Sequence, residues 1–221
     1  MNPVFPSILS TNYFNLESRL SAFEKGRIDF IHLDIMDGHF VDNISFGPAM
    51  ARAIKDQFPF RLDAHLMVSN PARMIPHFID AGADWLSFHV ETEDPCDELI
   101  AVIQDSGRRA GLALNPDTPL ERVQPFLNRL DYVLLMSVFP GFGGQKFIVD
   151  SLERVRRLKQ EIDRLQSHCQ LQVDGGITLD NVSSLQTAGA DLFVIGTHLF
   201  NAENIEEKIG QLSNRLQWSQ R

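Results

Sequence analysis

The sequence has little cysteine, little basic charge and no long apolar run. Its 221 residues include only two cysteines, Cys96 and Cys169, which lie far apart and outside any paired motif, and this excludes a disulfide framework. Acidic residues outnumber basic ones by 29 to 20, giving a net charge of −9, a poor match for nucleic acids or anionic membranes. Apolar segments end well before the ~18 residues of a membrane span, and no signal-peptide pattern opens the chain. We therefore expect a cytoplasmic protein with neither nucleic-acid nor membrane partners.

The overall amino-acid composition is typical of a globular protein. Hydrophobic residues make up 43% and charged residues 22% of the chain, which excludes wholesale disorder and collagen-like or low-complexity scaffolds. The length suits one large domain or two small ones. Since no linker or shift of composition interrupts the chain, we expect a single domain over residues 1–221.

Eight short apolar segments alternate with longer amphipathic ones. Each has the length of a buried strand and is bounded by turn-forming residues, and their starts are on average about 27 residues apart. The predicted strands are 4–10, 30–36, 62–68, 85–90, 109–114, 132–138, 171–174 and 192–195, and helices are predicted at 71–81, 150–165 and 204–216. Eight such units predict an α/β fold of the (β/α)₈ TIM-barrel type. The alternative, a doubly wound open sheet, usually has fewer strands, and its G-x-G-x-x-G turn is absent after the first strand.

A histidine and a carboxylate alternate along two of the predicted strands, and a third strand ends in a carboxylate. Side chains two residues apart share a face of a strand, so His32 and Asp34 point the same way, as do Asp63 and His65, while Asp174 ends the seventh strand. The carboxyl ends of barrel strands meet at one mouth. Two imidazoles and two carboxylates there (His32, Asp34, His65 and Asp174) suit Zn, Fe, Mn or Co better than Ca or Mg. The alternative is a hydrogen-bonded polar cluster without metal, in which Asp34 orients His32.

Glycine-rich segments follow the last three predicted strands. Backbone amides exposed by glycine can approach and bind an anion, and barrels commonly bind phosphate after strands seven and eight. The residues concerned are Gly141, Gly143, Gly144, Gly175, Gly176, Gly196 and Thr197. Three such segments at consecutive strand ends predict a phosphate site.

Methionines end three of the predicted strands. Core filling is the usual role of Met36, Met67 and Met136, and an apolar lid around a metal is the alternative. The remaining histidines are expected in surface or structural roles, namely His39 and His89 at loop ends and His77, His168 and His198 in solvent or against helices. Cys96 has no base nearby in sequence, so we do not expect a nucleophile there.

Eight short sequence motifs match those of a known enzyme family in order and spacing. They are PSILS at 6–10, HLDIMDGHFV at 32–41, FGP at 46–48, DAHLMV at 63–68, GLALNPDTP at 111–119, PGFGGQKF at 140–147, VDGGI at 173–177 and AGAD…FVIGT at 188–197. In this order and spacing the chain resembles the ribulose-phosphate 3-epimerase family, isomerases that interconvert D-ribulose 5-phosphate and D-xylulose 5-phosphate in the pentose phosphate pathway and the Calvin cycle. The motifs cover nearly the whole chain.

The resemblance implies a mechanism and a set of site residues. It implies inversion at C3 through a metal-stabilised cis-enediolate, with Asp34 and Asp174 as the two acid/base groups. His32, Asp34, His65 and Asp174 match the ligands of one divalent transition metal per subunit. The implied substrate contacts are Ser7, Met36, His65, Met67, Met136, Gly141, Gly143, Gly144, Asp174, Gly175, Gly176, Gly196 and Thr197. The substrate is then a ketopentose phosphate, and a homo-oligomer is implied because family members form dimers or larger assemblies.

The chain departs from the family at a few positions, and other functions stay open. Thr197 stands where the family usually has Ser, and Phe139, Asp42 and Asn12 also depart from it. One alternative is a 3-epimerase of a related ketose phosphate such as D-allulose 6-phosphate, although those relatives tend to interrupt the GFGGQ and VDGGI motifs. A decarboxylase or aldolase on a similar phosphate-binding barrel is another alternative, although such enzymes usually have a lysine at the inner end of a strand. The last alternative is a sugar-phosphate-binding barrel without turnover.

Overall fold

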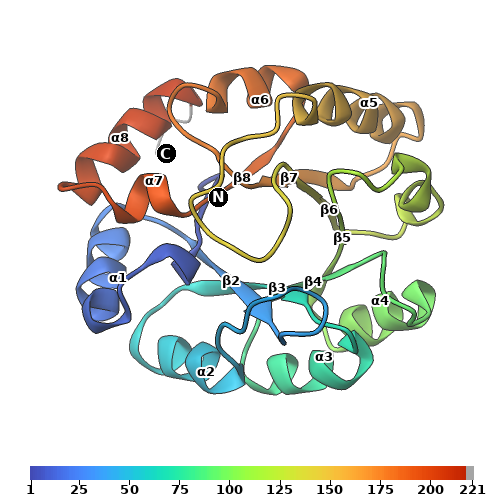
Figure 1. The fold of residues 1–221 in the computed structure, drawn as a ribbon, viewed down its shortest axis with the longest axis horizontal. Helices are drawn as coiled ribbons and strands as arrows, with labels where there is room; N and C mark the ends of the chain where they lie inside the picture. The colour runs from blue at the N-terminus through green and yellow to red at the C-terminus, as the bar shows by residue number, and fades with distance from the viewer. Residues whose placement is uncertain (218–221) are drawn as a thin grey trace.

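Eight parallel strands form a nearly closed barrel inside a ring of helices, in a computed structural model that describes residues 1–217 (Figure 1). The strands are β1 (Val4–Pro6), β2 (Phe30–Met36), β3 (Arg61–Met67), β4 (Trp85–His89), β5 (Arg109–Leu114), β6 (Tyr132–Met136), β7 (Gln170–Asp174) and β8 (Leu192–Ile195). The α-helices are α1 (Leu16–Lys25), α2 (Pro48–Gln57), α3 (Pro71–Asp80), α4 (Cys96–Asp105), α5 (Ser151–Arg164), α6 (Val182–Ala188), α7 (Thr197–Phe200) and α8 (Ile205–Arg215). The predicted (β/α)₈ fold is confirmed.

The expectation of a strand over residues 4–10 was wrong. The first strand ends at Pro6, because the Ser7 hydroxyl accepts the amide of Leu9 and starts the 3₁₀ helix η1 (Ile8–Ser10). Between β5 and β6, proline at 119 and 125 favours two 3₁₀ helices, η3 (Leu120–Arg122) and η4 (Gln124–Phe126), where a barrel unit normally has an α-helix.

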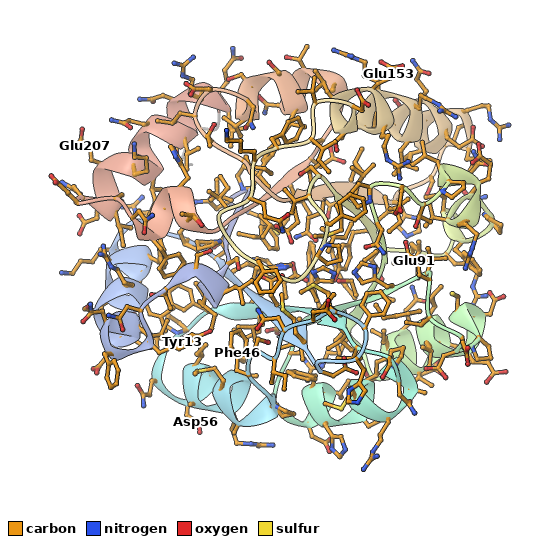
Figure 2. All side chains as sticks on the ribbon, in the orientation of Figure 1. Tyr13, Phe46, Asp56, Glu91, Glu153 and Glu207 are labelled. Carbon is orange, nitrogen blue, oxygen red and sulfur yellow. The ribbon has the colours of Figure 1, made fainter. Side chains whose placement is uncertain are left out.

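The outer helices are amphipathic, as the sequence pattern predicts. In α5, Val155, Leu158 and Ile162 are buried on one face, and Glu153 points outward with other charged residues (Figure 2). The N-terminus of α3 is capped by Asn70, whose side chain accepts the Arg73 amide at 3.1 Å. Such a cap satisfies a backbone donor that the helix itself leaves unpaired.

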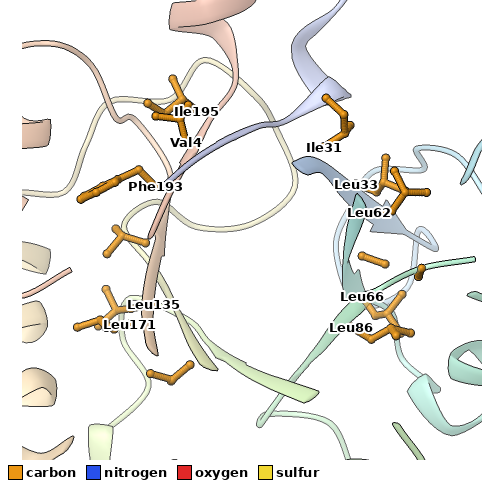
Figure 3. Close-up of a cluster of buried hydrophobic side chains, with 14 of the residues drawn as sticks. Val4, Ile31, Leu33, Leu62, Leu66, Leu86, Leu135, Leu171, Phe193 and Ile195 are labelled. Carbon is orange, nitrogen blue, oxygen red and sulfur yellow. The ribbon is translucent and has the colours of Figure 1, made fainter. Parts of the chain in front are cut away.

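The side chains of each strand point alternately outward, to an apolar layer under the helices, and inward, to the barrel interior. One set packs outward against the helices, and Figure 3 shows part of this layer, with Ile31, Leu33, Leu66 and Leu135 among the labelled side chains. The other set fills the barrel interior. Because side chains alternate along a strand, the outward direction of Leu33 turns its neighbours at 32 and 34 inward.

Aromatic side chains fill the barrel interior near the amino ends of the strands. The rings of Phe5, Phe30, Trp85 and Tyr132 pack in sequence, with centroids 4.6 to 5.0 Å apart between successive rings. A Cβ at Gly111 would lie 2.3 Å from the Tyr132 ring, so this strand position must be glycine. These residues lie toward the starts of their strands, which leaves the carboxyl ends for a cavity.

The barrel closes unevenly on the two sides of β1. On one side β1 pairs with β8, from Val4 against Phe193 to Pro6 against Ile195. On the other side, within residues 1–217, β1 and β2 are joined by one isolated bridge between Ser7 and His32. The seam between these strands therefore lies at the predicted site.

Candidate metal centre and active site

A cavity of about 620 Å³ opens at the carboxyl ends of the strands. It is lined by every residue predicted to contact substrate except His65: Ser7, Met36, Met67, Met136, Gly141, Gly143, Gly144, Asp174, Gly175, Gly176, Gly196 and Thr197. The structure thus brings the predicted contacts to one place, and their role in binding stays a prediction.

The four predicted metal ligands meet at the bottom of this cavity. His32 and Asp34 come from β2, His65 from β3 and Asp174 from β7, and one donor atom of each lies within 4.8 Å of the others. Asp34 Oδ1 is 3.4 Å from both His32 Nε2 and His65 Nδ1, and Asp174 Oδ2 is 3.9 Å from the same two nitrogens. Two imidazole nitrogens and two carboxylate oxygens therefore face one small space.

The donor set fits a transition metal. His32 Nε2 is fully buried and has no hydrogen-bond partner within residues 1–217, although it points among carboxylates. Imidazole nitrogen with carboxylate oxygen, in a set of four, is the chemistry of zinc and similar divalent ions. These residues could hold a metal, and which metal stays a prediction.

Ionisation in the cluster also favours a cation at its centre. Burial alone would lower the pKa of His32, but Asp34 and Asp63 raise it well above its usual value. Burial lowers the pKa of His65 to about 4, so that this ring is neutral at pH 7. The protein groups therefore attract a proton to Nε2 of His32, and a metal ion would have to displace that proton.

The two aspartates ionise at different pH. Burial opposes ionisation of Asp34, yet His32 and His65 hold its pKa well below its usual range, and its Oδ2 accepts the Ser7 hydroxyl at 2.5 Å. Burial and the nearby charge of Asp34 raise the pKa of Asp174 well above its usual range. Before any metal charge is added, Asp34 is a carboxylate and Asp174 a carboxylic acid at neutral pH.

The His32 ring is held by Asp63, a carboxylate that the sequence pattern placed on the same face as His65 without assigning it a role. Asp63 Oδ2 lies 2.8 Å from His32 Nδ1 and accepts the side-chain amide of Gln172 at 2.8 Å. Its Oδ1 accepts the Tyr132 hydroxyl at 2.9 Å. Asp63 thereby turns Nε2 of His32 toward the cavity.

The His65 ring contacts a histidine, His89, for which we expected a surface or structural role, and the structure gives it the structural one. His89 is fully buried at the end of β4, and its Nε2 lies 2.9 Å from Nε2 of His65. Its Nδ1 lies 3.0 Å from Oε2 of Glu91, a residue that the sequence did not single out. The signal that could have found them is the alternation of His89 and Glu91 after a strand.

Three further residues line the cavity. His198 lies on α7, and its Nε2 accepts the Leu179 amide at 3.4 Å. Ser10, which no pattern had assigned, accepts the Thr197 hydroxyl at 2.9 Å and lies in the glycine-rich region. Phe139, one of the departures from the family, is half exposed at the rim.

We expect Asp63→Asn to lower the free energy of unfolding by about 1–3 kcal/mol, because an amide donor would then face side chains that need an acceptor. Denaturant unfolding with chelator present would measure this without a contribution from metal. Asp56→Asn is the control, since Asp56 is exposed on α2 (Figure 2). Equal stability of the two variants would contradict the structural role of Asp63.

Comparison with known proteins gives matches over the whole chain. A profile described as the ribulose-phosphate 3 epimerase family matches residues 3–200. The ribulose-phosphate 3-epimerase of Aquifex aeolicus is 41% identical over 216 residues, covering 98% of this chain and 97% of that protein. That of Escherichia coli K12 is 37% identical over 215 residues, covering 96% and 95%, and that of Bacillus subtilis is 39% identical over 213 residues, covering 96% and 98%.

Solved structures agree on the fold. The 3-hexulose-6-phosphate synthase of Salmonella typhimurium superposes with a TM-score of 0.74 at 16% identity, covering 97% of this chain and 98% of the other. A mutant tryptophan synthase alpha-subunit of Pyrococcus furiosus gives a TM-score of 0.69 at 15% identity, covering 98% of each. At such low identity these likenesses describe the barrel alone. No helix within residues 1–217 combines the length and hydropathy needed to cross a bilayer.

Proposed function

The chain belongs to the ribulose-phosphate 3-epimerase family and is an isomerase, and we propose that it inverts C3 of D-ribulose 5-phosphate with Asp34 and Asp174 as the acid/base pair. The observation that supports this most is the convergence of His32, Asp34, His65 and Asp174 at the bottom of the cavity that the glycine-rich loops line. The product is D-xylulose 5-phosphate.

We propose that one divalent transition metal (Zn, Fe, Mn or Co) is held by these four residues in each subunit. When bound, such an ion supplies Lewis-acid stabilisation of the negative charge that develops on the substrate oxygens. The chain's own part is to orient the two rings, through Asp63 on His32 and His89 on His65.

Inversion requires that a proton leave one face of C3 and another arrive on the opposite face. Asp34 on β2 and Asp174 on β7 are separated by β1 and β8 in the order of the barrel, so they approach a substrate from two sides. In each direction of the reaction one aspartate acts as base and the other as acid. The roles exchange in the reverse direction, and Ser7 holds the Asp34 carboxylate in place.

We assign the phosphate to the glycine-rich loops. Gly144 and Gly176 have positive φ of 77° and 62°, a conformation that favours glycine. Because glycine has no side chain, the backbone at these positions is open to a ligand. A Cβ at Gly143 would lie 2.4 Å from the Ser10 hydroxyl, so the backbone there approaches the opposite wall closely. Backbone amides in such loops bind an anion without a net positive charge on the protein.

An assay with three substrates tests the function. We expect kcat/KM to be highest for D-ribulose 5-phosphate, lower for D-allulose 6-phosphate and at least about 100-fold lower for unphosphorylated D-ribulose, since loss of a charged hydrogen-bonding group costs about 3 kcal/mol. Faster turnover of D-allulose 6-phosphate would make the chain the related hexulose epimerase. Binding of D-ribulose 5-phosphate without turnover by metal-loaded protein would make it a non-catalytic barrel.

We also propose a cytoplasmic homo-oligomer. Two free cysteines, Cys96 and Cys169, support a reducing compartment, and the family resemblance supports an assembly of identical subunits. Light scattering of the purified protein measures the mass of the assembly directly, and a mass of 25.0 kDa would mean a monomer.

A further inference from the structure

We propose that Glu91 and His89 are positioning residues that fix His65 in the tautomer whose Nδ1 is free to bind the metal. Neither residue belongs to the ligand set or lines the cavity. The inference rests on the proposed metal site and deepens it, since it says how one ligand nitrogen is kept unprotonated.

The three side chains form a continuous hydrogen-bonded row that leads away from the cavity. The rings of His65 and His89 are both fully buried and meet edge to edge, with Nε2 atoms 2.9 Å apart, centroids 5.0 Å apart and planes at 25°. Nδ1 of His89 then lies 3.0 Å from Oε2 of Glu91. In the view of Figure 2, Glu91 lies inside the outline of the molecule and Glu153 and Glu207 lie at its edge, and the Glu91 side chain is 20% exposed.

The position of each proton follows from the Glu91 end of the row. Burial alone would raise the pKa of Glu91, but hydrogen bonds from His89, the Asn115 amide and the Thr118 hydroxyl lower it to about 2. A carboxylate only accepts, so Nδ1 of His89 carries the hydrogen. With Nδ1 of His89 donating to Glu91, Nε2 of His89 is the nitrogen that can accept from Nε2 of His65. The hydrogen of His65 then lies on Nε2, and Nδ1, which is 3.4 Å from Oδ1 of Asp34, is left to bind the metal.

Hydrogen bonds from the next loop to Glu91 fix the donor-to-acceptor direction of the hydrogen bonds in this row. Its Oε1 accepts the backbone amide of Asn115 at 2.8 Å, a donor that cannot become an acceptor. Arg154 holds this loop in turn, since its guanidinium donates to the carbonyls of Asn115 at 3.1 Å and Thr118 at 2.7 Å. The direction of the row is therefore set by main-chain groups outside the metal site.

The ring of His32 is also oriented by a carboxylate, but the contact is direct and has no intervening ring. Asp63 lies directly on Nδ1 of His32 and leaves Nε2 toward the cavity. Glu91 acts on His65 through one intervening ring and leaves the opposite nitrogen, Nδ1, toward the cavity. Carboxylates behind metal-binding histidines fix ring orientation and tautomer, and their loss typically costs 10- to 100-fold in metal affinity.

The isosteric variant Glu91→Gln is the decisive test. The Asn115 amide requires an oxygen opposite it, so the new side chain must turn its amide group toward His89. His89 would then accept at Nδ1 and donate from Nε2, and His65 would have to accept at Nε2 and carry its hydrogen on Nδ1. Each ring still has one hydrogen, but the metal-facing nitrogen of His65 is now blocked.

We expect Glu91→Gln to bind Zn²⁺ about 10- to 100-fold more weakly than the parent in competition with a chelator. Nitrogen-15 spectra of the metal-free protein with labelled histidine should show the hydrogen of His65 on Nε2 in the parent and on Nδ1 in the variant. Glu93→Gln is the matched control, because Glu93 lies on the same loop, carries the same charge and is exposed. The control should match the parent in both measurements.

The outcomes separate the two proposals. If the parent itself binds no Zn²⁺, the proposed metal site fails, while the spectra still decide the tautomer. If the parent binds Zn²⁺ and folded Glu91→Gln binds it equally with the hydrogen of His65 still on Nε2, the positioning role is overturned. His89→Phe, which keeps a ring of similar size, should also weaken Zn²⁺ binding, and unchanged affinity there would overturn the role of His89.

Discussion

Asp34→Asn and Asp174→Asn are each expected to lower kcat by several orders of magnitude. A general acid or base alone contributes about 10²–10⁴-fold, and each aspartate also contributes a proposed metal ligand. Because a proton removed from one face of C3 must be replaced on the other, one remaining aspartate cannot complete the inversion. Steady-state epimerisation of D-ribulose 5-phosphate measures the loss.

Exchange in deuterated water shows which half of the reaction a variant keeps. A variant with one working base and its metal should exchange the C3 proton of one epimer and form almost none of the other. Metal content must be measured first, since asparagine is a poorer ligand and an empty site would imitate the loss of a base. If either metal-loaded variant epimerises near the parent rate, the two-aspartate assignment is wrong.

Removing the metal is expected to abolish turnover, and Zn, Fe, Mn or Co should restore it. The reason is the donor set, in which His32 and His65 direct nitrogen atoms at the same space as two carboxylates. Imidazole binds these ions far better than it binds Mg²⁺ or Ca²⁺. Chelation followed by readdition of each ion, with metal analysis of every sample, measures the effect.

Magnesium and calcium serve as controls for this experiment. They should restore little activity to the metal-free protein, because they prefer oxygen ligands. The far-ultraviolet circular dichroism of the metal-free protein should match that of the loaded protein, since the barrel is built on strand pairing and apolar packing rather than on the cluster. Full turnover by protein shown to be free of metal would contradict the metal's role.

The eightfold recurrence of strand-like segments predicted the fold, and alternation within strands, taken with the barrel, predicted the convergence of the His/Asp cluster. His32 and Asp34 are two residues apart on a seven-residue strand that is buried throughout, so a single assumption, that of a barrel, directs both at the mouth. His65 lies opposite Asp34 in the register of β2 with β3, which follows from the same assumption. Local periodicity fixes which way a side chain points, and the barrel supplies the rest.

Contacts between unrelated segments could not be predicted in this way. The hydrogen bond of His89 to His65 depends on the tilt of two rings, and Glu91 gains its role from Asn115 and Thr118 on the next loop. Ser10 lies near Thr197 only because the first and last strands of the chain are neighbours. A sequence pattern records none of these distances.

Because β1 pairs with β8, β1 can form its strand pairing only after β8 has left the ribosome. Val4 has its register partner at Phe193, so the nascent chain cannot close its barrel until almost all of it has been synthesised. His32, Asp34 and His65 emerge early, whereas Asp174 emerges more than a hundred residues later. Domains generally fold as units during synthesis, and here the order of translation delays assembly of the four-residue His/Asp cluster until the barrel is nearly complete.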